Sequence, residues 1–392
     1  MHEGFGLATP QEMTAQQILA ELVSIPELPG TSNINMVNWV TSYLQNQGVE
    51  PHILPGPEGN RSNLFATIGP TNVPGIVLSG HMDVVPVEGQ DWTANPFILT
   101  DLGGKLTARG ASDMKGFLAC VLAMAPIFKA ADLKQPVHIA FSYDEEIGCR
   151  GVPHLINAIP DLCALPRLCI VGEPSDMRPV LSHKGKQAME LRFEGRSAHS
   201  SNPALGINAL YPAAETLLYL RDLAKRLESE GPFNESFTPP YPTVVAGVIN
   251  GGAAVNIIPE AANLKFEVRS VPGYEPKLIT GEILAKLDHL KLEAKAAGQP
   301  IEITFSELSS YPALAPVEDP DLVGFMEDCS GHRAIQAVSY GTEAGLFHAA
   351  GIPSIICGPG SITRAHRPDE YILQSELDAC MQMLDKVRQT MR

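Results

Sequence analysis

Short apolar runs that alternate with helical segments constrain the fold of this chain more than any other feature of its sequence. Strands are expected at four short apolar runs, near 62–67, 75–79, 136–142 and 168–172. Helices are expected over 14–24, after a capping threonine, over 34–47 and over about 114–129. Because strands and helices alternate along the chain, the sequence predicts an α/β fold around a mostly parallel sheet.

The pattern changes between residues 184 and 298. The segment "QAMELRFEG" (187–195) alternates polar and apolar residues, which is typical of a strand with one exposed face. Helices are expected near 205–228 and 275–297. Because 392 residues are too many for one simple core, we expect an α+β two-layer domain at 184–298. This domain would be inserted into an α/β domain formed by 1–183 and 299–392.

The formal net charge of −16 at pH 7 argues against nucleic acid or an anionic membrane surface as a partner. No apolar stretch reaches the roughly 18 residues that a membrane span needs. The first residues, "MHEGFGLATPQEMTAQQ", lack the basic and apolar regions of a signal peptide. Seven cysteines are scattered without a CxxC pair, several of them in apolar runs. Reduced core cysteines of this kind predict a cytoplasmic protein.

Polar residues stand where several of the expected strands and loops end. They are His81 and Asp83 in "GHMDVVP", Asp113 in "GASDMKG", Asp144, Glu145 and Glu146 in "SYDEEIGCRG", Glu173 in "VGEPS" and His366 in "AHRPDEY". Each type has an ordinary structural explanation. A neighbour can satisfy a strand-end histidine, and a loop histidine is usually solvated. An aspartate can cap the helix that follows it, and acids before a helix suit its dipole.

Taken together, these residues favour a metal site. The carboxyl ends of strands in an open α/β sheet converge on one crevice, and carboxylates gathered there repel one another unless a cation lies among them. A strand places His81 and Asp83 on the same face, so the carboxylate can orient a metal-ligating imidazole. Imidazole and carboxylate donors without cysteine suit Zn²⁺, Co²⁺ or Mn²⁺ in an open catalytic site.

The order of these stretches resembles the M20 family of dinuclear zinc metallopeptidases and deacylases. "SGHMDVVP", "GASDMKG", "DEEIG", "GEPS" and "AHRPDEY" match its motifs and span most of the chain. The resemblance implies a hydrolase that cleaves the amide of a small N-acyl amino acid with a metal-bridging hydroxide. It implies two divalent ions as cofactors, Zn²⁺ or alternatively Co²⁺. It also implies that 184–298 is a lid and dimerisation domain, which makes a second copy of the chain a partner.

Carried over residue by residue, the resemblance implies a role for each side chain. The metal ligands are His81 and Glu173 for one ion, Glu146 and His366 for the other, and Asp113 as the bridge. Glu145 is the general base, Asp83 orients His81, and the peptide bond between Asp113 and Met114 is cis. His199, from the lid of a partner copy, donates a hydrogen bond to the tetrahedral oxyanion. The substrate-binding positions are Asn256, Arg269, Gly341, Thr342, Glu343 and Gly360.

Within the family, "GTEAGLFHAAGIPSIICGPGSITRAHRPDEY" (341–371) is most similar to the members that remove the acetyl group from N2-acetylornithine. Those members often carry cysteine before the bridging aspartate, where this chain has Ser112. Glu343 could pair with the ornithine ammonium or form a structural salt bridge. Desuccinylases, other N-acyl amino acid deacylases and peptidases of the family are alternatives. A further alternative is an inactive relative that only binds metal or peptide, but the presence of Glu145 argues against it.

Overall fold

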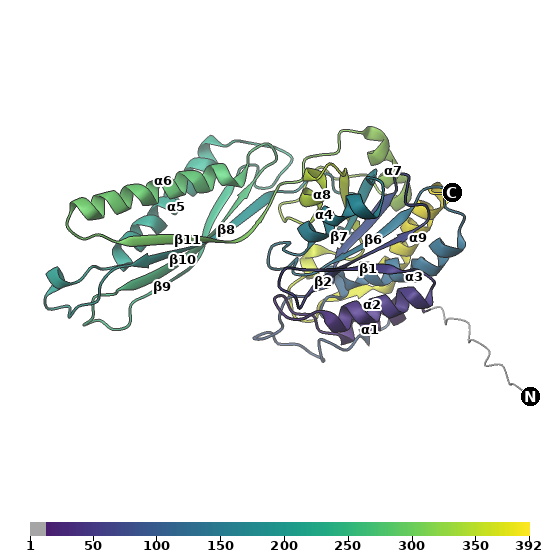
Figure 1. Ribbon diagram of the computed structural model, residues 1–392, viewed down its shortest axis with the longest axis horizontal. Coiled ribbons are helices and arrows are strands. Elements are labelled where there is room, and N and C mark those ends of the chain that lie inside the picture. The colour runs from purple at the N-terminus through teal and green to yellow at the C-terminus, as the bar shows by residue number, and fades with distance from the viewer. Residues whose placement is uncertain (1–12) are drawn as a thin grey trace, which may run out of the picture. The chain divides into compact units, whose positions relative to one another are not determined.

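The computed structural model describes residues 13–392 of the chain, which form two compact units (Figure 1). Unit 1 contains the chain up to Leu181 together with Pro316–Gln336 and Thr342–Arg392. Unit 2 contains Ser182–Ala315 and Ala337–Gly341. The expected absence of a signal peptide depends mainly on residues 1–12, which lie outside the described residues.

Unit 1 is built on a six-stranded sheet with the strand order β1–β2–β6–β3–β7–β12. These strands are β1 (Pro51–Pro55), β2 (Ser62–Ile68), β3 (Ile76–His81), β6 (Val137–Ser142), β7 (Leu168–Pro174) and β12 (Ser354–Gly358). β6, β3, β7 and β12 are parallel, whereas β2 is antiparallel to both of its neighbours, β1 and β6. The predicted α/β class with a mostly parallel sheet is therefore confirmed.

Helices flank this sheet, with α1 and α3 on one side and α4 and α8 on the other (Figure 1). The helices of unit 1 are α1 (Ala15–Ser24), α2 (Ile34–Asn46), α3 (Gly116–Ala130), α4 (Val152–Leu162), α7 (Pro320–Ser330), α8 (Ala344–Ala349) and α9 (Gln374–Thr390). The hydroxyl of Thr14 accepts the N–H of Gln17, whose side chain accepts the N–H of Thr14 in return. This capping box confirms the predicted capping threonine before α1.

The helix at the centre of unit 1 is unusually apolar. Ala111–Ala130 is long and apolar enough to cross a membrane by length and composition, with a mean hydropathy of 1.4. Asp113, Lys115 and Lys129 carry charge within this segment, so the uncharged run between Lys115 and Lys129 is itself shorter than a membrane span needs. Of the apolar window, 89% is buried within the protein. Such burial is typical of a core helix, and α3 packs against α1 and α9.

A small sheet and a helical turn lie beside the end of the large sheet. The small sheet has the order β13–β5–β4, with β4 (Thr100–Asp101), β5 (Lys105–Thr107) and β13 (Tyr371–Leu373). A π-helical turn, η1 (Ala111–Lys115), leads from β5 into α3, and the Asp113–Met114 peptide bond inside it is cis as predicted. β5 pairs with β13, so the chain before Asp113 lies beside the chain after His366.

Unit 2 consists of an antiparallel four-stranded sheet covered by two long helices (Figure 1). The sheet has the order β11–β8–β10–β9, with β8 (Gly185–Glu194), β9 (Thr243–Gly251), β10 (Ala261–Ser270) and β11 (Glu302–Tyr311). The helices are α5 (Leu210–Glu230) and α6 (Pro276–Ala296). Side chains of β8 and β10 alternate between buried and more exposed positions, and the buried ones form one core with the two helices.

The second boundary of unit 2 differs from the expected one. The sequence places the end of this unit at 298, but the compact unit continues to Ala315 and takes up Ala337–Gly341 as well. The reason is that β11 pairs with β8 from Glu302 to Tyr311. Pairing between strands more than a hundred residues apart is not encoded in the local pattern of either strand.

Candidate metal centre

The strand ends of unit 1 bring the predicted ligands to one edge of the sheet. β3 ends at His81 and lies between β6 and β7, both parallel to it. Glu145 and Glu146 follow the end of β6, and Glu173 lies near the end of β7. Parallel neighbours end at the same edge of a sheet, so these side chains converge.

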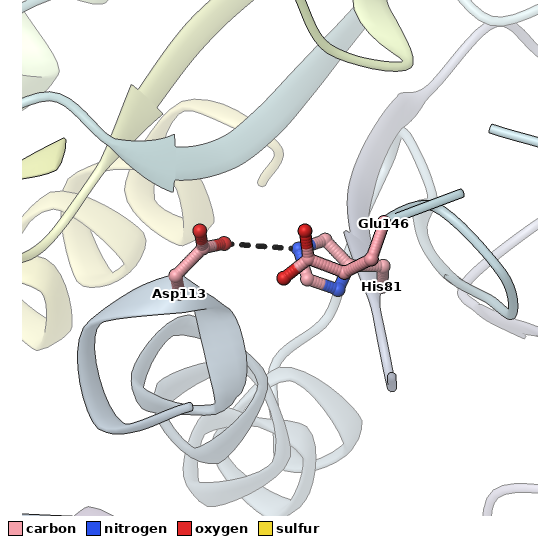
Figure 2. Close-up of side chains that lie close together, drawn as sticks. All are labelled: His81, Asp113 and Glu146. Carbon is pink, nitrogen blue, oxygen red and sulfur yellow. Dashed lines mark hydrogen bonds and ion pairs between the residues drawn. The ribbon is translucent and has the colours of Figure 1, made fainter. Parts of the chain in front are cut away.

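His81 lies at the middle of this group. Its Nε2 atom is 3.0 Å from Oδ1 of Asp113 (Figure 2). The same atom is 3.8 Å from Oε1 of Glu173. Its Nδ1 atom is 2.8 Å from the backbone carbonyl of Asp83 and 3.6 Å from the carboxylate of the same residue. The nearer contact that fixes the ring is thus the carbonyl of Asp83, whereas the sequence pointed to its carboxylate. The Nδ1 contact leaves Nε2 directed at the carboxylates.

The carboxylate of Asp83 has another use that the sequence did not reveal. It accepts the backbone N–H groups of Glu145 and Glu146, each at 3.1 Å. Asp83 itself is fully buried. The same residue therefore contacts His81 and fixes the backbone of both glutamates that follow β6.

Asp113 lies between the two histidines. Its Oδ1 atom faces His81, and its Oδ2 atom is 3.4 Å from Nε2 of His366. Burial would raise the pKa of Asp113, but the contacts with both histidines lower it below its ordinary value. His366 also lies 3.0 Å from Oε2 of Glu146. Hydrogen bonds with Asp113 and Glu146 raise the pKa of His366 to about 10.

The pKa values of two of the gathered carboxylates are raised, as expected where acidic groups converge on a cation site. Burial, with Asp113 and Glu145 close by, raises the pKa of Glu173 well above its ordinary value. Burial raises the pKa of Glu145 to about 8, His81 opposes this shift, and Glu146 adds to it. Repelling carboxylates are thus held together by histidines that carry protons. A divalent cation would supply the same positive charge between the same atoms.

The donor atoms lie close enough to hold metal ions. One group is formed by His81, Asp113 and Glu146 (Figure 2). A second is formed by His81, Glu145 and Glu173, and the ligand atoms of each group lie within 4.8 Å of one another. Nitrogen and oxygen donors without sulfur suit Zn²⁺ or Co²⁺. The residues present therefore fit a metal centre, and His366 reaches both Asp113 and Glu146 at its open side.

Glu145 has a neighbour that the sequence did not single out. The thiol of Cys149 lies 3.3 Å from Oε1 of Glu145. Burial raises the pKa of this thiol well above its ordinary value, so Cys149 is a protonated hydrogen-bond donor to the glutamate. The seven cysteines are all buried and free in residues 13–392, as expected for core thiols.

Two of the predicted substrate-binding residues of unit 1 are buried in its core. Glu343 is 1% exposed and accepts hydrogen bonds from the hydroxyls of Ser79 and Ser142. Thr342 is also buried, and its hydroxyl accepts the N–H of Ala344 at the start of α8. Both hydrogen bonds enclose the carboxylate between β3 and β6, which favours the structural one of the two roles expected for Glu343.

Gly360 has a conformation and a position that require glycine. Its φ angle is +82°, and a Cβ atom here would collide with the side chain of Ser112, the residue before Asp113. Its carbonyl accepts the N–H of Asp176. Of the substrate-binding candidates in unit 1, Gly360 thus lies next to the candidate metal centre.

The remaining candidates belong to unit 2. His199 is exposed, contacts the hydroxyl of Ser201 at 2.7 Å and forms a β-bridge with Ile257, next to Asn256. Arg269, on β10, donates to Glu267 at 2.9 Å and to the carbonyl of Ser339 at 3.4 Å. The structure therefore brings His199 and Asn256 together. Gly341 packs against the ring of Tyr311, where a Cβ atom would collide.

Comparison with known proteins identifies the class of enzyme to which this fold and site belong. Residues 77–389 match Peptidase family M20/M25/M40, and the chain belongs to this family. The predicted resemblance is confirmed, and the chain is a hydrolase that acts on amides.

Individual members of this family are similar to the chain over most of its length. An acetylornithine deacetylase of Proteus mirabilis (strain HI4320) is 32% identical over 379 residues, covering 95% of each chain. Another, from Photorhabdus laumondii subsp. laumondii, is 34% identical over 364 residues and covers 91% of each. An M20 family metallo-carboxypeptidase from Sulfolobus solfataricus has the same fold, with a TM-score of 0.75, 21% identity and coverage of 94% of this chain and 97% of that one.

Proposed function

We propose that this chain removes the acetyl group from N2-acetyl-L-ornithine and releases ornithine and acetate. Hydrolysis is supported above all by the meeting of His81, Asp113 and His366 with three glutamates at one edge of the sheet. Acetylornithine as the substrate is supported by the 32–34% identity with acetylornithine deacetylases over most of the chain. Another small N-acyl amino acid is the alternative within the same family.

We assign two divalent ions, Zn²⁺ or Co²⁺, to the gathered donors. In this assignment His81 and Glu173 would hold one ion and Glu146 and His366 the other, and Asp113, with one oxygen toward each histidine, would serve both. When bound, such ions supply an activated water and polarise a carbonyl oxygen. Asp83 supports the set from behind, because it contacts His81 and the backbone of both following glutamates.

Glu145 is the proposed general base. It follows β6 directly before Glu146, its backbone N–H is fixed by Asp83, and its side chain accepts from Cys149. In this role Glu145 takes a proton from the attacking water and gives it to the amine that leaves.

Residues of unit 2 complete the proposal. We assign His199 as a hydrogen-bond donor to the oxyanion, and Asn256 and Arg269 to the carboxylate of the substrate. The guanidinium of Arg269 is planar and can bind a carboxylate with two hydrogen bonds, although Glu267 occupies it in this structure. The exposed position of His199 leaves its Nε2 atom free of protein contacts among the described residues.

We also propose that unit 2 forms a homodimer. β9 lies at the edge of its sheet, and its apolar side chains Val245, Val248 and Ile249 are exposed. Val255 and Ile257, beyond β9, are exposed as well. An exposed apolar edge strand is a site of pairing unless it is covered, so a second copy of the chain is the proposed occupant.

A substrate panel tests the proposed function. Acetate release from N2-acetyl-L-ornithine is measured by an enzyme-coupled assay with the metal-loaded protein, before and after treatment with a chelator. N-acetyl-L-methionine, N-succinyl-diaminopimelate and a dipeptide are the comparison substrates. The proposal requires kcat/KM to be highest for acetylornithine and turnover to stop on chelation. Higher kcat/KM for another substrate would reassign the chain within the family, and turnover without metal would contradict the proposed mechanism.

A further inference from the structure

A buried ion pair joins the two chain segments that carry Asp113 and His366. Nη1 of Arg109 donates to Oε2 of Glu370 at 2.7 Å, and each residue is only 1% exposed. Arg109 lies between β5 and η1, and Glu370 lies just before β13. Neither residue is a donor in the candidate metal centre.

Glu370 fixes the backbone at Asp113. Its Oε1 atom accepts the N–H of Ser112 at 2.9 Å and the N–H of Asp113 at 3.1 Å. Both N–H groups belong to η1, the segment directly before α3, and the carboxylate gives each of them a partner. The other oxygen of Glu370 is taken by Arg109, so both oxygens have partners.

Arg109 fixes the backbone at His366. Its Nη1 atom also donates to the carbonyl of Arg367 at 3.3 Å, and its Nη2 atom donates to the side chain of Gln90. Gln90 in turn donates to the carbonyl of His366 at 3.0 Å. The guanidinium of Arg109 lies 4.9 Å from the ring centre of Trp92, so this ring covers one face of the guanidinium. One side chain is thus connected to both segments.

Stability alone does not explain this arrangement. Taking two charges out of water costs several kcal/mol for each ion, and well-packed apolar residues often stabilise a core as well as a buried pair does. The contacts of this pair are, however, directional and end on the backbone next to two candidate ligands. Side chains behind metal ligands typically change metal affinity by about 10- to 100-fold when they are altered.

We infer that the Arg109–Glu370 pair is a positioning device for metal binding. It holds the backbone of Asp113 and the backbone of His366 in one fixed arrangement, so that a carboxylate and an imidazole from distant segments meet at the same ion. The inference rests on the proposed metal-dependent function. It adds Arg109, Glu370 and Gln90 to the residues on which that function depends.

Zinc affinity of the metal-free protein tests this inference without an activity assay. The wild type and E370Q are titrated with Zn²⁺ against a chromophoric chelator, and folding is checked by circular dichroism and thermal unfolding. Glutamine keeps the size of Glu370 but turns an N–H₂ group toward a donor of Arg109 or of the backbone. We expect E370Q to bind Zn²⁺ about 10- to 100-fold more weakly than the wild type.

E376Q is the matched control. Glu376 also accepts from an arginine, Arg364 at 2.7 Å, and from a backbone N–H, that of Leu373 at 2.8 Å, but it does not contact Asp113. A purely structural role of Glu370 would lower the unfolding temperature of E370Q and E376Q alike and leave zinc affinity unchanged. Positioning would lower zinc affinity in E370Q and not in E376Q.

Q90L keeps the test decisive if E370Q does not fold. Gln90 lies in a partly exposed loop, and Q90L removes both its contact with the carbonyl of His366 and the acceptor for Nη2 of Arg109, while Glu370 is unchanged. We expect Q90L to lower the affinity for one of the two zinc ions. If every folded variant bound both ions with wild-type affinity, the inference would be overturned but the proposed function would not. A wild type that binds no zinc would overturn the proposed function and, with it, this inference.

Discussion

The carboxylate of Asp83 and the backbone of Glu145 are joined by a hydrogen bond of 3.1 Å. The second oxygen of Asp83 binds the N–H of Glu146 at the same distance, and its carbonyl contacts His81. A single buried residue therefore sets the direction of a candidate base and of two candidate ligands. This relationship makes Asp83 more than a support for one histidine.

Replacing Asp83 by asparagine is expected to impair the metal centre without unfolding the protein. The amide N–H₂ would face the N–H of Glu145 or Glu146, so one of the two hydrogen bonds is lost. We expect metal affinity and kcat to fall about 10- to 100-fold. Zinc titration and steady-state kinetics measure both. D101N is a suitable control, because Asp101 accepts the N–H of Gly104 in a surface turn; unchanged metal affinity in D83N would contradict the assigned role.

Glu145 and Glu146 are neighbours with different proposed roles, and glutamine substitutions can separate them. E145Q removes the proton acceptor but no proposed ligand, so we expect a loss of about 10²- to 10⁴-fold in kcat with full metal content. E146Q removes a proposed ligand and is expected to lower the metal content. Elemental analysis of the purified variants, alongside turnover, makes the comparison. Metal loss in E145Q with metal retained in E146Q would reverse the two assignments.

Glu343 is expected to contribute to stability and not to substrate selection. Its carboxylate accepts from Ser79 on β3 and Ser142 on β6, and E343A would leave both buried hydroxyls without this partner. We expect a loss of about 1–3 kcal/mol in the free energy of unfolding, measured by urea denaturation. KM should change by the same factor for acetylornithine and acetylmethionine. A selective rise in KM for acetylornithine would restore the role in substrate binding.

Local patterns account for what the sequence predicted about the site. His81, Asp113 and Glu173 each stand at the end of an apolar run or the start of a helix, so their position at one sheet edge follows from the strand and helix periods. Acids and histidines gathered at such an edge favour a bound cation, because the carboxylates otherwise repel one another. The residues alone therefore predicted a metal site at this edge, whereas the role of each ligand was implied by the resemblance to the M20 family and stays a prediction.

Contacts between distant segments account for what the sequence did not predict. Glu343 is 201 residues from Ser142, and Glu370 is 257 residues from Asp113. No sequence period or motif links such partners. From the sequence alone, a buried glutamate that is hydrogen-bonded to a distant segment therefore cannot be distinguished from one in a substrate pocket. The same holds for β11, whose place in unit 2 depends on its pairing with β8. Side chains that position the ligands are thus harder to predict than the ligands themselves.

The edge strand of unit 2 provides a test of the proposed homodimer. Val248 is exposed on β9, where a lysine would place a charge in any apolar interface without disturbing the core. We expect the wild type to be a dimer and V248K to be a monomer in size-exclusion chromatography with light scattering. L218K is the control, because Leu218 is exposed on α5. A monomeric wild type would contradict the proposal directly.

His138 is expected to make the protein sensitive to acid independently of any metal. It lies on β6, fully buried, with its Nδ1 atom 2.9 Å from the hydroxyl of Thr67 and its ring stacked on Phe65. Burial lowers the pKa of His138 from 6.5 to about 4. The unfolded chain therefore binds a proton between pH 6.5 and 4 that the folded protein does not, so stability falls as the pH falls through this window and levels off below it.

A comparison with H138Q isolates this contribution. Glutamine does not titrate, so the variant lacks the acid-induced loss, which amounts to about 3 kcal/mol across the window for a shift of this size. The measurement is the free energy of urea unfolding of the metal-free wild type and variant at pH 7, 5.5 and 4. The difference between them should shift in favour of H138Q toward pH 4, because both proteins share every other titrating group. A difference that stays constant with pH would show that His138 is protonated in the folded protein as readily as in the unfolded chain.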